Sequence, residues 1–144
     1  MNNPVFNCRQ MVVLMVALSA LVGAGRLAYA EDVKVNLSGN QEVPAVSTSA
    51  SGSGTFTIGE DHSVSGSVTT TGIAGTAAHI HMAASGQNGG VIVPLIKKGE
   101  NEWTVSPGVK LTDQQYQAFK DGNLYVNVHS AAHPSGEIRA QLKP

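Results

Sequence analysis

Four of the five histidines fall in two short windows, His79-Ile80-His81 and 129–133, which reads His-Ser-Ala-Ala-His. Alternate residues of a β-strand point to the same face, so His79 and His81 would project together while Ile80 enters the core. Neutral imidazole is a common ligand for copper, zinc, nickel and iron. An imidazole pair at this spacing can therefore hold one metal ion.

The second window adds further candidate ligands. His129 has the opposite phase to Val126 and Val128, which places it on the outer face of its own strand. If the two strands pair, or face each other across a loop, His79, His81 and His129 converge, and His133 could reach in from the following turn as a fourth ligand. A site of nitrogen donors without thiolate is compatible with Cu(II) or Zn(II). We expect copper, with zinc as the alternative cofactor.

A simpler interpretation of the same histidines also stands. Paired imidazoles on an exposed strand can hydrogen-bond only to neighbours or to water. His62 lies beside Asp61 in a predicted loop, and we interpret it as solvated. Met82 has the opposite phase to His79 and His81, which favours core packing over metal binding.

Four polar residues share the outward phase of the last two strands, namely Tyr125, Asn127, Glu137 and Arg139. Glu137 could accept a hydrogen bond from a ligating imidazole, as carboxylates near metal sites often do. We favour the alternative, an exposed Glu137–Arg139 ion pair that contributes less than about 1 kcal/mol. Glu42 follows the first strand and could satisfy either a buried turn or a site, and the sequence leaves both open.

Alternating apolar and polar residues predict an all-β fold. The expected strands are residues 33–37, 55–58, 64–68, 78–82, 91–96, 102–105, 124–129 and 137–142. Pro94 lacks an amide donor, so we expect its strand to lie at an edge or to end there. The stretch 46–54 is rich in Ser and Ala, and we interpret it as a long loop. About seven or eight short strands favour an antiparallel β-sandwich or a Greek-key barrel.

One short helix is expected near residues 113–121. Thr112 and Gln115 have the spacing of a capping box, and Tyr116 and Phe119 lie on one helical face. Gly122 can adopt the left-handed conformation that ends a helix.

Residues 1–30 have the pattern of a cleavable signal peptide. Arg9 precedes an apolar run at 11–24, and Ala28-Tyr29-Ala30 is the small-x-small pattern that signal peptidase requires. The run is shorter than the roughly 20 residues of a bilayer span, although a retained anchor is the alternative. We expect cleavage after Ala30, one mature domain over residues 31–144, no membrane association after cleavage, and a secreted or periplasmic location.

Composition excludes several classes of function. The formal net charge is −1, and removal of residues 1–30 takes away Arg9, Arg26 and the only cysteine, Cys8. No basic cluster or aromatic stacking platform is present, which argues against nucleic-acid binding. A Gly-x-Ser-x-Gly elbow is also absent, which argues against a hydrolase, and we lean against an enzyme of any kind while leaving the question open.

Several blocks resemble the CHRD domain, a module also found in chordin. They are LSGNQEVP at 37–44, AHIH at 78–81, GGVIVPL at 89–95, GNLYVNVH at 122–129 and PSGEIR at 134–139. Two small departures from the pattern occur at Ala83 and Ala140, and both concern packing. The resemblance implies a β-sandwich over residues 31–144 and an extracytoplasmic location, but no particular reaction.

Three functions remain to be weighed. We expect an exported protein that binds a metal ion, most plausibly copper, through the histidine cluster. The alternative is a non-catalytic extracytoplasmic module that engages a protein or polymer without metal. The His-x-His strand also resembles the copper-binding strand of Cu/Zn superoxide dismutase, but an Asp-plus-His cluster for zinc and a cationic funnel are missing, so a dismutase-like redox enzyme is the least favoured.

Overall fold

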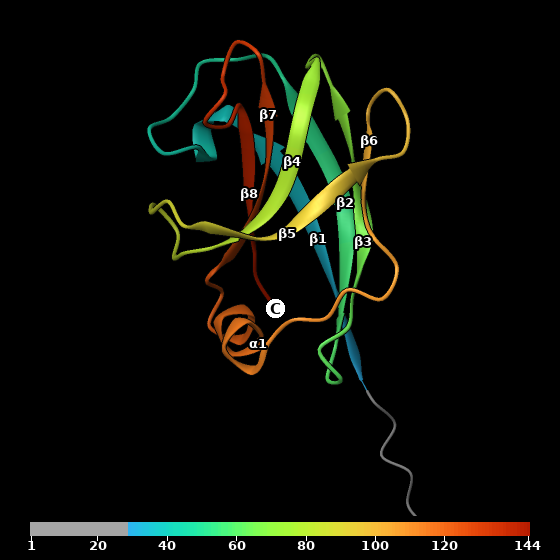
Figure 1. Cartoon of the computed structure of the whole chain (residues 1–144). Coiled ribbons are helices and arrows are strands. Elements are labelled where there is room, and N and C mark those ends of the chain that lie inside the picture. Colours follow the sequence, from blue (N-terminus) through green and yellow to red (C-terminus); the bar gives the residue numbers. More distant parts are fainter. Residues whose placement is uncertain (1–28) are drawn as a thin grey trace, which may run out of the picture.

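The computed structural model describes residues 29–144, so the predicted signal peptide lies almost entirely outside the described residues. Eight strands, one α-helix and one 3₁₀ helix follow in chain order (Figure 1): β1 Ala30–Ser38, η1 Gly39–Gln41, β2 Ser51–Gly59, β3 Val64–Thr71, β4 Gly75–Met82, β5 Gly90–Lys97, β6 Glu102–Val105, α1 Asp113–Lys120, β7 Leu124–Ser130 and β8 Ile138–Leu142. Within residues 29–144, no helix has the length and apolar character that crossing a bilayer requires.

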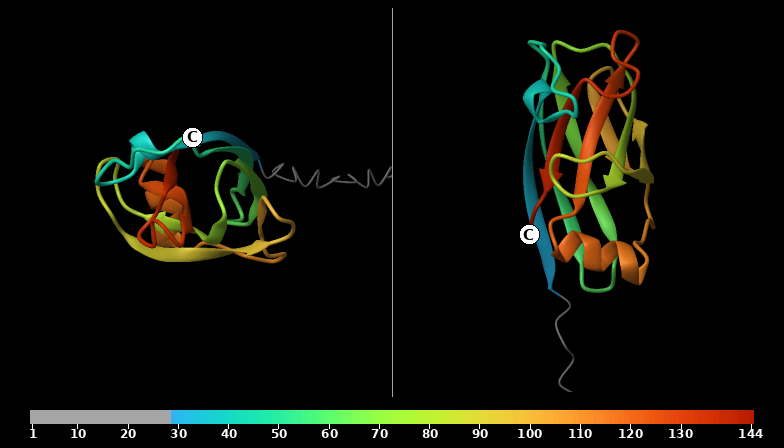
Figure 2. Two further views of the ribbon diagram at one scale, coloured as in Figure 1. Left: turned by 90° about the horizontal axis from the view of Figure 1, so that it is seen from above. Right: turned by 90° about the vertical axis from the view of Figure 1, so that its left-hand side faces the viewer.

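The strands form a closed antiparallel barrel in the order β1-β2-β3-β6-β5-β4-β7-β8. Pairing of Ser38 with Arg139 joins β1 to β8 and completes the ring, which is flattened when seen from above (Figure 2, left). Of the two architectures expected from the sequence, the structure adopts the barrel. Within residues 29–144, closure gives every strand a neighbour on both sides, although β1 and β8 meet at one paired position only.

The apolar residues of the predicted alternating segments fill the barrel interior. Val33, Val35 and Leu37 of β1 are buried, and the residues between them are mostly exposed. Phe56 and Val68 on the neighbouring strands are completely buried. Since an aliphatic or aromatic side chain contributes roughly 1.5–3 kcal/mol when fully buried, this interior is the main source of stability in a domain without a disulfide.

The prediction of a loop over 46–54 is wrong for its second half, because β2 begins at Ser51. Gly52 pairs with Leu37, and Gly54 pairs with Val35. At Gly54 a Cβ atom would lie only 2.0 Å from the carbonyl oxygen of Ser67. The backbones of β2 and β3 approach too closely here for side chains, so a composition typical of loops forms a strand instead.

The expectation of an edge strand at Pro94 is also wrong, because β5 pairs on both sides and continues to Lys97. Pro94 lies opposite His79 of β4, and pairing with β6 begins at the next residue, Leu95. The proline therefore occupies the point where β5 changes partners. There the missing amide donor interrupts neither ladder.

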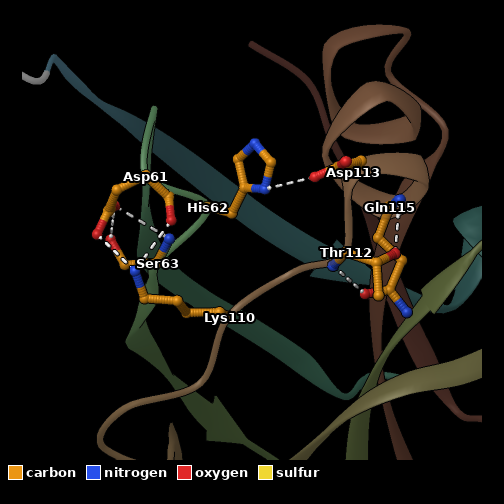
Figure 3. A network of polar contacts seen from close by, with 7 residues as sticks. All are labelled: Asp61, His62, Ser63, Lys110, Thr112, Asp113 and Gln115. Atoms are coloured by element: carbon orange, nitrogen blue, oxygen red, sulfur yellow. Dashed lines mark hydrogen bonds and ion pairs between the residues drawn. The ribbon is translucent and has the colours of Figure 1, made fainter.

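The helix prediction is confirmed. The Thr112 hydroxyl accepts from the Gln115 amide at 3.2 Å, and the Gln115 side chain accepts from the Thr112 amide at 2.9 Å. His62, which we interpreted as solvated, is half-buried against this helix (Figure 3). Its ring stacks on Tyr116 with centroids 4.3 Å apart, and its Nδ1 lies 3.5 Å from a carboxylate oxygen of Asp113. Sequence periodicity did not indicate that the 59–63 turn meets the helix.

Two loops cover the outer face of β7 and β8. Arg139 of β8 donates to the carbonyl of Gln87 at 2.8 Å and to the amide oxygen of Asn88 at 3.2 Å. The Asn88 side chain in turn donates to the carbonyl of Val43 at 2.7 Å, which links the loop after β4 to the loop after η1. Figure 2 (right) shows both loops on this side of the barrel. Tyr125, Asn127 and Arg139 on this outer face are consequently buried, whereas His129 and Gln141 are only partly buried.

The preferred interpretation of Glu137 and Arg139 as an exposed ion pair is therefore wrong. Arg139 is 1% exposed and Glu137 is 8% exposed. The Glu137 carboxylate accepts from the Thr48 hydroxyl at 2.7 Å, whereas the Arg139 guanidinium lies 3.4 Å from the centre of the Tyr125 ring. Each charged group has its own partners in the layer under the loops.

Candidate metal centre

Pairing of β4 with β7 brings the two histidine windows together. Ala77 lies opposite His129, His79 opposite Asn127, and His81 opposite Tyr125. Ile80 is 1% exposed and points into the barrel, so the flanking imidazoles project from the outer face as the sequence predicted. The condition for convergence, pairing of the two strands, is met.

The three imidazoles form a compact group. His79, His81 and His129 each offer one nitrogen, and these nitrogens all lie within 4.8 Å of one another. Nδ1 of His79 is 3.0 Å from Nε2 of His129. This distance is that of a hydrogen bond between the two rings, and it also matches the roughly 3 Å that separates two nitrogens bound to one ion at about 2.0–2.1 Å.

Backbone carbonyls fix which nitrogen two of the rings present. Nδ1 of His81 lies 2.9 Å from the carbonyl oxygen of Gly89, and Nδ1 of His129 lies 2.9 Å from the carbonyl oxygen of Pro134. A carbonyl only accepts, so each Nδ1 carries the proton and each Nε2 carries the lone pair. Such bonds commonly orient metal-binding histidines.

His81 has the strongest signature of a ligand. Its side chain is buried, with 7% exposed, and its Nε2 has no hydrogen-bond partner among the described residues. Leaving a buried acceptor unpaired costs about 1–3 kcal/mol, and a bound metal ion would remove that cost. The free lone pair on Nε2 makes His81 the first candidate ligand of the group.

Burial also keeps the imidazoles neutral. It lowers the pKa of His81, and the charges of His129 and Arg139 act in the same direction, against hydrogen bonds with Gly89 and Asn127. Burial likewise lowers the pKa of His79, aided by His129 and His81. Because only the neutral ring binds a metal, the site remains competent to lower pH than free histidine would.

An aromatic stack supports His81 from one side. The ring of Tyr125 is nearly parallel to His81, at 5° and with centroids 4.8 Å apart, and the Arg139 guanidinium lies over Tyr125. The Tyr125 hydroxyl accepts from the Gly89 amide at 3.1 Å. Since Gly89 also binds His81, Tyr125 holds both the ring and the loop that orients it.

His133 lies outside this three-histidine group. Its backbone amide donates to the Ser130 hydroxyl at 3.1 Å, and its charge acts on Glu137. Burial raises the pKa of Glu137, but hydrogen bonds with Ser130 and Thr48 together with His133 lower it overall. Glu137 thus interacts with the turn that carries His133, and no hydrogen bond links it to a ring of the cluster.

Sequence reasoning missed the roles of Gly89 and Pro134, which act through backbone carbonyls, and it left Asn127 and Glu42 without a function. Both side chains are buried, at 3% and 7% exposed, and Asn127 lies directly opposite His79. The outward phase of Asn127 was visible in the sequence, but the loops that bury Asn127 and Glu42 were not.

A known protein family accounts for nearly all of the described residues. The sequence model of the CHRD domain matches residues 33–142, which span β1 to β8. The chain belongs to the CHRD family. No curated protein and no solved structure matches the chain. The CHRD match thus confirms the family resemblance, and the three histidines all lie within the matched CHRD domain.

Proposed function

We propose that this CHRD protein is an exported metal-binding protein that holds a single copper ion through His79, His81 and His129. The observation that supports the proposal most strongly is the convergence of three imidazole nitrogens within 4.8 Å. Two of these rings present Nε2 because backbone carbonyls hold their Nδ1 protons. His133 remains a candidate ligand only if the turn that carries it moves.

The choice of copper follows from the donor set. Imidazole binds copper, zinc, nickel and iron, and among divalent ions a given site of nitrogen donors binds Cu(II) most tightly. Three imidazoles without thiolate are also a known arrangement for zinc, which stays the alternative. Export is likewise proposed, and its support is the signal-like pattern of residues 1–30.

Metal titration of the purified domain tests the proposal. Replacing His81 and His129 together with alanine should weaken Cu(II) binding by more than about 100-fold, since even the loss of residues behind the ligands costs 10- to 100-fold. Competition against a chelator of known affinity measures the constant for Cu(II) and then for Zn(II). We expect tighter binding of Cu(II) by the wild-type domain.

His62→Ala is the matched control, because it removes a histidine that contacts the helix rather than the cluster. This variant should bind Cu(II) within about threefold of wild type. Equal and weak binding by wild type and the double variant would reject the proposal. A metal-free domain that still retains an extracytoplasmic partner in excess chelator would instead favour a non-catalytic interaction module.

A further inference from the structure

Asn127 occupies the centre of the histidine cluster. On β7 it lies directly opposite His79, and His129 and Tyr125 are its two neighbours on the same face. His81 and His129 are separated by four residues along the paired strands, or about 13 Å of strand length. Their ring centroids are nevertheless only 6.1 Å apart. The two rings therefore converge toward the position between them, which is that of Asn127.

The amide oxygen of Asn127 is the unpaired part of this side chain. Asn127 is 3% exposed, and its Oδ1 has no hydrogen-bond partner among the described residues. Nε2 of His81 shares this property. An unpaired buried amide oxygen is costly, and amide oxygens are established donors to metal ions. Asn127 also acts on His81 as a hydrogen-bond partner that raises its pKa, so the two groups face each other, and one ion bound to both atoms would replace that contact.

Glu42 lies behind Asn127. A Cβ atom on Gly136 would lie 2.5 Å from Nδ2 of Asn127 and 2.7 Å from Oε1 of Glu42, so both side chains adjoin the space that this glycine leaves. Burial raises the pKa of Glu42, while a hydrogen bond with Asn127 and the charge of Arg139 oppose the increase. A carboxylate that accepts from a ligand's N–H orients that ligand and increases its donor strength.

We propose that Oδ1 of Asn127 is a fourth ligand of the metal, and that Glu42 orients the amide from behind. This inference rests on the proposed function of the three histidines. Oxygen is a harder donor than imidazole nitrogen, so a site of three nitrogens and one oxygen favours Cu(II) and Zn(II) over Cu(I). Asn127 thereby sets the oxidation-state preference of the site.

The test compares Cu(II) and Cu(I) affinities of the domain with Asn127 replaced. Asn127→Ala should lower Cu(II) affinity about tenfold or more and leave Cu(I) affinity within about threefold. Asn127→Asp keeps an oxygen donor of similar size and should bind Cu(II) at least as tightly as wild type. Asn101→Asp is the control for added charge, because it makes the same change at an exposed residue of the loop between β5 and β6, and its metal affinities should not change.

The outcomes separate the two proposals. Tight Cu(II) binding by wild type together with an unchanged Cu(II) constant in Asn127→Ala would overturn the fourth ligand and leave the three-histidine site intact. Parallel loss of Cu(II) and Cu(I) affinity in Asn127→Ala would indicate a purely structural role and also overturn it. Weak binding by the wild-type domain would overturn both proposals.

Discussion

Replacing Arg139 with leucine is expected to lower the free energy of unfolding by about 3 kcal/mol or more. The guanidinium is buried, stacks on Tyr125 and donates to Gln87 and Asn88 in the loop after β4. Leucine removes these bonds and also removes the positive charge that acts on Glu42. Urea unfolding at neutral pH measures the loss.

The loss of unfolding free energy in Arg139→Leu should depend on pH. Burial already raises the pKa of Glu42 above its ordinary 4.5, and Arg139 opposes this increase. Without Arg139 the folded-state pKa rises further. A carboxyl with a raised pKa contributes its stability below the unfolded-state value and loses it as pH rises through the folded-state value. The deficit should therefore be smallest below about pH 4 and grow toward neutral pH.

Two companion variants separate charge from geometry. Arg139→Lys keeps the charge but not the planar fork, so it should recover only part of the stability. Adding Glu42→Gln to Arg139→Leu removes the buried acid, so the double variant should be less unstable at neutral pH than the sum of the two single changes. A pH-independent deficit, or full additivity, would show that Glu42 and Arg139 are not coupled.

Gly54→Ala should destabilise the barrel by about 3 kcal/mol or more, at the upper end of what overpacking usually costs. The new Cβ would lie 2.0 Å from the Ser67 carbonyl oxygen and 2.8 Å from Cα of Val68. Both contacts are with backbone, which cannot rotate away as a side chain can. The strands β2 and β3 would have to separate where they are most closely paired.

Gly90→Ala provides the matched control, because a Cβ at Gly90 meets nothing within 4 Å. Its free energy of unfolding, measured by thermal denaturation, should differ from that of wild type by less than about 0.5 kcal/mol. If Gly54→Ala were as stable as Gly90→Ala, the close approach of β2 and β3 described above would be incorrect.

Local pattern was sufficient to predict most of the fold. Alternation identified the β4 and β7 segments, and the capping box located α1, because both signals depend on neighbouring residues alone. The errors arose where distant segments decide the structure. Ser51 to Gly54 form a strand because β3 lies close beside them, and Pro94 is tolerated because β5 changes partners there.

The site was predictable only in part. Because strand geometry has a strict period of two, spacing and phase placed His79 with His81 and put His129 on the outer face of its own strand. The pairing of β4 with β7 that joins them was only a condition of the prediction. Phase does not reveal whether an outer face is covered. The loops that bury Arg139, Asn127 and Glu42, and the carbonyl of Gly89 that orients His81, depend on long-range contacts that no short sequence window contains.

Native mass spectrometry of the protein purified from its own compartment tests export and copper binding together. One spectrum reports both the N-terminus and any bound ion. We predict a chain that begins at Glu31 and carries one copper ion. The His81→Ala/His129→Ala variant should begin at the same residue and carry no copper. A mature chain that lacks metal, or equal copper on wild type and the double variant, would contradict the proposal.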